Sequence, residues 1–136
     1  MDLVTGGAGF IGSHLVDALV AQGKSVRVLD NFSSGREEFL AHHNGAANVE
    51  IFRADLLDPD SVKKAMQGID TVHHLAANPD IRLGTEVTDT DLRQGTVATY
   101  NVLEAMRCEG VSCISFSSSS AIYGEASIMP TPETYG

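Results

Sequence analysis

The stretch Thr5-Gly6-Gly7-Ala8-Gly9-Phe10-Ile11-Gly12 decides the fold of this 136-residue chain. It ends a short apolar run, Asp2 to Thr5, and opens an apolar-periodic one, Phe10 to Gln22. A strand that turns sharply into a helix needs glycine, because side chains would block both the turn and the close approach of the helix. Gly23 then caps the expected helix. The opening residues therefore predict a strand, a glycine-rich turn and a helix.

The second predicted strand ends on an acidic residue. Ser25 to Leu29 is an apolar run that predicts a buried strand, and Asp30 follows it. An acid about twenty positions after a glycine-rich turn accepts hydrogen bonds from a ribose and repels a 2′-phosphate, while the helix N-terminus faces a pyrophosphate. The pattern therefore predicts a dinucleotide site and favours NAD over NADP; a glycine-rich turn without a ligand is the alternative. Spacing alone permits two glycine registers, Gly7-Gly9-Gly12 and Gly6-Gly9-Gly12.

Composition narrows the class of protein. The length is that of one domain, residues 1–136, and a hydrophobic content of 43% is ordinary for a globular protein. A net charge of −9 without a Lys/Arg cluster argues against a nucleic-acid surface. No apolar run approaches a membrane span, and no signal segment precedes the first strand, so we expect a cytoplasmic protein that does not bind a membrane.

The cysteines and histidines predict no metal site. Cys108 and Cys113 have no histidine at ligand spacing and are expected to be free thiols. The pair His42-His43 falls in a polar loop, where we expect solvated rings. The pair His73-His74 falls in a predicted strand, which points the two rings to opposite faces. We expect this second pair to pack and to form hydrogen bonds.

Strands and helices alternate along the rest of the chain. After a polar stretch, the sequence predicts a strand from Val49 to Ala54, a helix from Ser61 to Gln67, a strand from Asp70 to Leu75, a helix from about Thr88 to Glu109 and a strand from Val111 to Phe116. Nearly continuous apolar strands that alternate with helices predict an α/β fold with a doubly wound parallel sheet, covered on both faces.

In such a sheet, a ligand lies beyond the carboxyl ends of the strands. The candidate residues follow the strands: Gly6 to Gly12, Asp30-Asn31, Asp55-Leu56, Ala76-Ala77-Asn78 and Ser117 to Ser120. Asp55 could accept a hydrogen bond from an adenine amino group, or it could cap a turn. Small residues at Ala76 and Ala77 would let a cofactor pass close to the backbone.

These segments resemble the extended short-chain dehydrogenase/reductase family, and within it the archaeal-type UDP-glucose 4-epimerases. The resemblance rests on the glycine stretch, Asp30-Asn31-Phe32-Ser33-Ser34-Gly35, Ala54-Asp55-Leu56, His74-Leu75-Ala76-Ala77-Asn78-Pro79, Ala98 to Ala105 and Phe116 to Gly124. It implies the register Gly6-Gly9-Gly12, NAD as cofactor and a Rossmann-like fold that is incomplete at its C-terminal end. The implied cofactor-binding residues are Gly6, Gly9, Phe10, Ile11, Gly12, Asp30, Asn31, Ser34, Gly35, Asp55, Leu56, Leu75, Ala76, Ala77 and Ser117.

The resemblance also implies the chemistry. In this family, a Ser or Thr four residues before the Tyr of a Tyr-Gly pair binds the 4-hydroxyl of the substrate; here that residue is Ser119, counted from Tyr123-Gly124. A serine-rich strand end that only caps backbone groups is the alternative. Related dehydratases carry an Asp and a Glu at the next two positions, where this chain has Ser120 and Ala121. The expected activity is therefore that of an isomerase, the NAD-dependent 4-epimerisation of a UDP-sugar.

The sequence departs from the resembled family in two places. The family's catalytic pair has the form Tyr-x-x-x-Lys, in which the lysine lowers the pKa of the tyrosine. Here Ser127 follows Tyr123 at that spacing, and the last lysine is Lys64. Tyr135 could begin the pair, although the residues before it resemble the loop that precedes the catalytic tyrosine. Gly95 stands where the family usually has an Asn near the nicotinamide.

Two hypotheses remain open. In the first, the chain is the NAD-binding part of a sugar-nucleotide 4-epimerase, lacks the substrate-binding region and is inactive alone. In the second, it is a non-catalytic nucleotide-binding module, either self-standing or completed by a partner chain. Homodimers are common in the resembled family, and the helix from Thr88 to Glu109 is the candidate contact, although the sheet alone could cover its apolar face.

Overall fold

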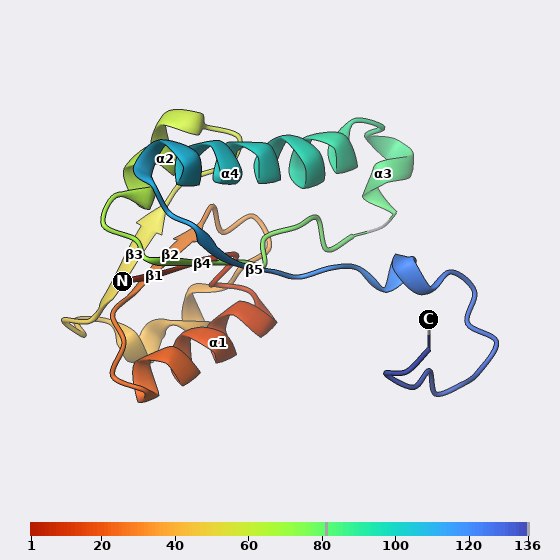
Figure 1. The fold of residues 1–136 in the computed structure, drawn as a ribbon, viewed down its shortest axis with the longest axis horizontal. Helices are drawn as coiled ribbons and strands as arrows, with labels where there is room; N and C mark the ends of the chain where they lie inside the picture. Colours follow the sequence, from red (N-terminus) through yellow and green to blue (C-terminus); the bar gives the residue numbers. More distant parts are fainter. Residues whose placement is uncertain (81, 136) are drawn as a thin grey trace.

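Residues 1–80 and 82–135 are described by the computed structural model, which contains one parallel sheet (Figure 1). Its strands are β1 (Asp2–Thr5), β2 (Val26–Asp30), β3 (Val49–Arg53), β4 (Thr71–His74) and β5 (Cys113–Phe116). They are ordered β3-β2-β1-β4-β5, and each adjacent pair is parallel. The strand order reverses between β1 and β4. This topology confirms the predicted doubly wound sheet.

Helices cover both faces of the sheet, as Figure 1 shows. Helix α1 (Phe10–Ala21) lies on one face, and α2 (Pro59–Met66) and α4 (Ala98–Glu109) lie together on the other. Leu3 belongs to the apolar cluster under α2 and α4, whereas its neighbour Val4 belongs to the cluster under α1. Burial of each such side chain contributes about 1.5–3 kcal/mol. The alternation of the strand residues thus builds two cores, which hold the strand ends in register.

Helix α2 begins two residues before the predicted Ser61. Asp58 caps its N-terminus by accepting hydrogen bonds from the backbone N–H groups of Asp60 and Ser61. Pro59 then occupies the first helical position, where its missing N–H costs nothing. The predicted start was two residues too late, because the helix is capped at Asp58 and Pro59 already belongs to its first turn.

The helix predicted from Thr88 to Glu109 is not one regular α-helix. A short helix α3 (Leu83–Glu86) comes first, and Leu92–Val97 forms a π-helical segment that continues into α4. The backbone N–H of Ala98 donates to the carbonyl of Arg93, five residues earlier. Apolar spacing does not distinguish this wider turn from an α-helical one, which is why the prediction was wrong here.

The remaining helical turns are short 3-10 segments. They span Glu37–Phe39, Ala41–His43 and Ser120–Tyr123. After β5, the chain runs away from the layered body (Figure 1). Most residues of 117–119 and 122–135 are exposed. All four residues of β5 are themselves exposed. This strand therefore forms an open edge of the described sheet.

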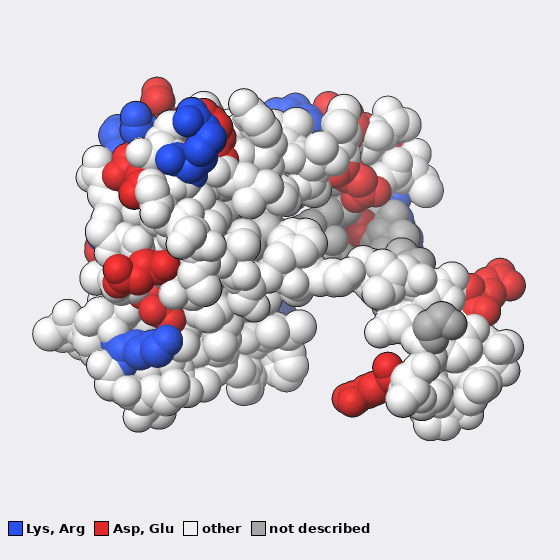
Figure 2. Space-filling view, viewed as in Figure 1, with Lys and Arg blue, Asp and Glu red and all other residues white. Residues whose placement is uncertain are grey.

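The surface carries charges of both signs. On the face drawn in Figure 2, Lys and Arg side chains lie in small groups beside acidic ones and form no continuous basic stripe. Cys108 and Cys113 are exposed free thiols, as expected. Within the described residues, every helix is too short or too polar to span a membrane.

Candidate functional site

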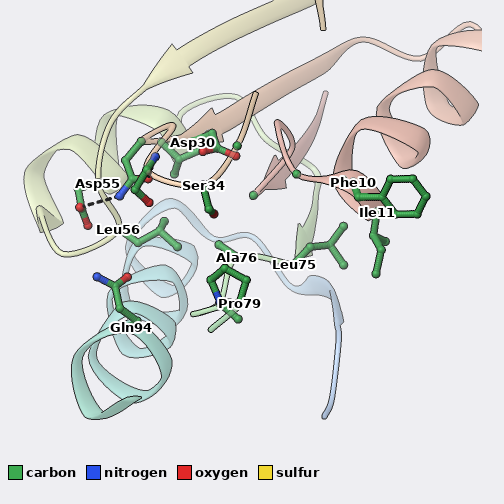
Figure 3. A pocket seen from close by; sticks show the side chains of 18 of the residues that line it. Phe10, Ile11, Asp30, Ser34, Asp55, Leu56, Leu75, Ala76, Pro79 and Gln94 are labelled. Carbon is green, nitrogen blue, oxygen red and sulfur yellow. Dashed lines mark hydrogen bonds between the residues drawn. The ribbon is translucent and has the colours of Figure 1, made fainter. Parts of the chain in front are cut away.

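A cavity of about 370 Å³ opens at the carboxyl ends of the strands (Figure 3). Every residue predicted for the cofactor site lines it. These residues are Gly6, Gly9, Phe10, Ile11, Gly12, Asp30, Asn31, Ser34, Gly35, Asp55, Leu56, Leu75, Ala76, Ala77 and Ser117. The structure thus brings together segments that follow all five strands, while their binding of a cofactor stays a prediction.

The glycine-rich turn leaves no room for side chains at three positions. Gly6 has a φ of +69°, and a Cβ there would lie 2.9 Å from the Cα of Ala76. A Cβ on Gly12 would lie 2.2 Å from the carbonyl oxygen of Gly6. Gly7 instead faces the core, because its Cβ would lie 2.8 Å from the Cγ1 of Val28. The register Gly6-Gly9-Gly12 is therefore the one that borders the cavity.

The N-terminus of α1 lies at the cavity without a side-chain cap. Gly9 occupies the cap position, and the first turn holds no acidic residue. Uncapped N–H groups and the helix dipole favour an anion at this end. Among the described residues that line the cavity, none is Lys or Arg. Attraction of an anion here must therefore come from the backbone.

Asp30 joins the end of β2 to the glycine-rich turn. Its Oδ2 accepts a hydrogen bond from the N–H of Ala8 at 2.9 Å, and its Oδ1 accepts one from the N–H of Phe32 at 2.8 Å. The residue is 9% exposed. A carboxylate oxygen can accept more than one hydrogen bond. Asp30 can therefore hold the turn and still accept from a ligand hydroxyl.

Asp55 is also a turn cap, which was the alternative considered for it. Its Oδ1 accepts from the N–H of Leu57 at 2.8 Å, and its Oδ2 accepts from the amide of Asn31 at 2.9 Å. Figure 3 shows Asp30 and Asp55 toward one end of the cavity, with Phe10 and Ile11 at the other. The two acids are the only charged residues among those described as lining the cavity. The two carboxylate acceptors and the N-terminus of α1 thus lie at opposite ends of the cavity.

A buried network fixes the loop after β4. The hydroxyl of Thr5 accepts from the N–H groups of Leu75 and Ala76 at 3.2 and 3.3 Å, and it lies 2.7 Å from Nδ1 of His74. Because the hydroxyl oxygen of Thr5 already accepts two hydrogen bonds, the hydroxyl acts as the donor in its hydrogen bond to Nδ1, and Nδ1 accepts. The ring proton therefore lies on Nε2, which donates to Thr99 at 3.1 Å. A neutral His74 positions the small residues beside Gly6.

Burial lowers the pKa of His74 below the ordinary value of 6.5. The unfolded chain therefore takes up the proton first, so this contribution to stability is present above pH 6.5 and is lost as the pH falls toward the folded-state pKa. We expect the free energy of unfolding to decrease more between pH 7.5 and 5.5 for the native chain than for His74→Gln, by at most about 1.4 kcal/mol per pH unit. Urea unfolding at both pH values measures the difference; equal decreases would contradict it.

The other histidines fall on both sides of expectation. Nε2 of His73 lies 3.1 Å from Asp2, on the opposite face from His74, as the strand pattern predicted. The expectation of a solvated ring holds for His42, whose side chain is 56% exposed, and was wrong for His43, whose side chain is only 9% exposed. Both rings hydrogen-bond to Asp17. The 3-10 turn folds back onto α1, which local polarity does not reveal.

The predicted catalytic serine lies apart from the cavity lining. Ser117 lines the cavity, and its N–H donates to the carbonyl of His74 at 3.2 Å. Ser119 is exposed and is not among the lining residues, so its catalytic role stays a prediction. The side chains of Ser120 and Ala121, on which the contrast with dehydratases rests, lie outside the described part of the structure. The Ser127 hydroxyl lies 3.5 Å from the hydroxyl of Tyr135, and the Ser127 N–H donates to that same hydroxyl at 3.2 Å; these two hydrogen bonds lower the pKa of Tyr135.

Sequence reasoning missed five residues that line the cavity: Leu29, Ser33, Ala54, Pro79 and Gln94. Four of them adjoin predicted residues or belong to a quoted segment. Gln94 is different, because it comes from the π-helical segment Leu92–Val97. Such segments occur frequently at functional sites. No local sequence signal distinguished it from the regular helix that was expected.

The parallel sheet, its strand order and the glycine-rich turn between β1 and α1 define a Rossmann-like fold. Residues 3–135 match the NAD dependent epimerase/dehydratase family. The chain belongs to this family, which confirms the resemblance drawn from its motifs.

Curated relatives are similar over nearly the whole chain. UDP-glucuronic acid decarboxylase 4 of Arabidopsis thaliana is 38% identical over 135 residues, which cover 98% of this chain and 29% of the relative. A putative UDP-glucose 4-epimerase of Methanocaldococcus jannaschii is 38% identical over 139 residues, which cover 99% of this chain and 43% of the relative. The chain thus spans less than half the length of these relatives.

Solved structures are likewise similar over nearly the whole chain and are covered to less than half of their own length. A UDP-galactose 4-epimerase is 47% identical with a TM-score of 0.77, covering 98% of this chain and 43% of that one. The UDP-glucose 4-epimerase of Thermus thermophilus, solved in complex with NAD, is 39% identical with a TM-score of 0.84, and the covered shares are again 98% and 43%.

Proposed function

We propose that this chain forms the NAD-binding part of a sugar-nucleotide 4-epimerase of the UDP-glucose/UDP-galactose type. The observation that carries the proposal is the cavity at the strand ends, where an uncapped helix N-terminus, a glycine cradle and two carboxylates converge. The 47% identity to a UDP-galactose 4-epimerase supports the choice of reaction within the family. UDP-glucuronic acid decarboxylases at 38% identity make decarboxylation the nearest competing reaction.

The residues around the cavity fit NAD by their chemistry. The first-turn N–H groups of α1 would hold the pyrophosphate, and Asp30 would accept from the adenosine ribose. Asp55 would accept from the adenine amino group through the lone pairs that its turn leaves free. Ala76, held beside Gly6, would let the cofactor lie against the backbone. When bound, NAD supplies the hydride transfer at C4 that epimerisation requires.

The substrate side of the proposal rests on Ser119. Its hydroxyl would hydrogen-bond the 4-hydroxyl of a UDP-sugar, as in the resembled family. A base is also needed for the proton of that hydroxyl, and the sequence has no Tyr-x-x-x-Lys pair. We therefore expect the 136 residues alone to bind NAD without epimerising a sugar.

A titration of the purified chain tests both parts. We expect saturable NAD binding and no conversion of UDP-galactose or UDP-glucuronate in the presence of NAD. Absence of saturable NAD binding would contradict the cofactor assignment. Conversion of UDP-galactose that is abolished by Ser119→Ala would contradict the expectation of inactivity, and decarboxylation of UDP-glucuronate would replace epimerisation as the reaction.

The second candidate function is a non-catalytic nucleotide-binding module, completed by a partner chain or self-standing. This candidate requires only the cavity at the strand ends, which both candidates share. The DNA downstream of codon 136 separates the two candidates. A continuing reading frame with Tyr-x-x-x-Lys within about ten to fifteen codons supports the enzyme, whereas a stop codon supports the module.

A further inference from the structure

Three metal-ligating side chains converge outside the cavity. Nε2 of His42 and Nε2 of His43 lie 2.8 and 2.7 Å from the same carboxylate oxygen of Asp17. One ligand atom from each residue lies within 4.8 Å of the other two. None of the three residues lines the cavity at the carboxyl ends of the strands. The cluster therefore has no part in the function proposed above.

Two separate elements hold this cluster. Asp17 lies within helix α1, and the histidines lie in the 3-10 turn Ala41–His43. Leu40, which is 1% exposed, anchors the start of that turn in the core under α1, and its carbonyl accepts from the N–H of His43 at 2.9 Å. The two imidazole rings lie with centroids 4.1 Å apart. The donor atoms are thus positioned by the fold of this region.

The exposure of the three side chains suits a ligand that enters from solvent. The His43 side chain is 9% exposed, whereas those of His42 and Asp17 are 56% and 46% exposed. The buried ring would fix one ligand position. The open side leaves room for water to complete a coordination sphere, as metal sites with three protein ligands require.

We propose that Asp17, His42 and His43 form a binding site for a divalent transition-metal ion, with Zn²⁺ as the best match. Two imidazole nitrogens and one carboxylate oxygen are a typical zinc donor set. Bonds of about 2.0–2.1 Å in tetrahedral geometry place ligand atoms about 3.3 Å apart. The nitrogen–oxygen separations of 2.7 and 2.8 Å need to widen by about half an ångström to meet this. The ligand nitrogens of the two histidines, which lie within 4.8 Å of each other, need to settle at the same spacing.

Binding needs no oxidant and no additional group. Both rings bind the ion as neutral imidazoles through Nε2, so each proton now donated to Asp17 resides on Nδ1 or leaves to solvent. The ion then replaces two hydrogen bonds to one oxygen. Because it links α1 to the turn only in the folded chain, its binding stabilises the folded state.

The test uses the full 136-residue chain carrying Cys108→Ser and Cys113→Ser, because the two exposed thiols would otherwise bind the same ions. We expect one equivalent of Zn²⁺ by calorimetry, a rise of the thermal midpoint with Zn²⁺ concentration and a visible spectrum of bound Co²⁺. His42→Ala and Asp17→Asn, each in the same background, should weaken binding by about tenfold or more.

His14→Ala is the matched control, because His14 lies on the same helix and its ring bonds to the carbonyl of Phe10. This variant should keep full metal affinity. The proposal is overturned if Zn²⁺ neither binds nor raises the thermal midpoint, or if His42→Ala leaves the affinity unchanged. Should Asp17→Asn lose its circular dichroism signal, the largely exposed His42 still decides the outcome.

Discussion

Replacing Gly12 by Ala is expected to lower the free energy of unfolding by about 3 kcal/mol, at the upper end of the usual cost of overpacking. The new Cβ would lie 2.2 Å from the carbonyl oxygen of Gly6 and 2.7 Å from the Cα of Gly7. Both are backbone atoms, so only a shift of α1 away from the turn relieves the contact. The same shift moves the first-turn N–H groups, so we expect NAD affinity to fall by about tenfold or more, equivalent to about 1.4 kcal/mol. Urea unfolding and NAD titration measure the two effects.

Gly95→Ala is the matched control, because it makes the same chemical change in a helical segment. A Cβ at Gly95 would meet nothing within 4 Å. We expect this variant to be as stable as the native chain or more stable by up to about 1 kcal/mol, because alanine favours the helical conformation. If the two substitutions changed the free energy of unfolding equally, the close contact at Gly12 would not be the cause of the loss of stability.

Replacing Asp30 by Ala is expected to reduce NAD affinity by about ten- to a hundredfold, the range for a lost hydrogen bond to a charged group. The carboxylate is 9% exposed at the cavity, and it also accepts from the N–H groups of Ala8 and Phe32. Its removal takes away a ribose acceptor and loosens the turn, while the repulsion of a 2′-phosphate disappears. The affinity ratio of NAD to NADP should therefore shift toward NADP. Parallel titrations with both nucleotides measure it.

Asp70→Ala provides the charge-matched control for Asp30. Its side chain is 81% exposed and directly precedes β4, at the end of the sheet remote from the cavity. The two variants remove the same charge from the chain, so a long-range electrostatic effect would appear in both. Unchanged titration curves for both nucleotides in Asp30→Ala would refute the ribose contact.

Much of the fold and of the cavity could be predicted from local patterns. The apolar run before Asp30 located a strand end, and the glycine-rich stretch from Gly6 to Gly12 located a helix start. Ligand-facing residues in a parallel sheet follow the strands directly. Predicting where the strands end was therefore sufficient to predict most of the cavity lining, including Asp55 and Ala76.

Other features depended on contacts between distant residues. Gln94 lines the cavity from the π-helical segment Leu92–Val97, and the apolar spacing of that segment fits a regular helix equally well. The proton position on His74 follows from a hydrogen bond to Thr5, 69 residues earlier. Likewise, the polar sequence around His43 indicated solvent, whereas the fold places the ring against Asp17.

By itself, the sequence determined that the chain has a Rossmann-type fold and which residues follow its strands, beginning with the turn from Gly6 to Gly12. Glycine spacing and strand alternation are local constraints, so they can be read from neighbours in the chain. Tertiary structure alone decided the partners of Asp17, His42 and His74. Hydrogen bonds between segments depend on how helices and turns pack on the sheet, and no local pattern specifies that packing.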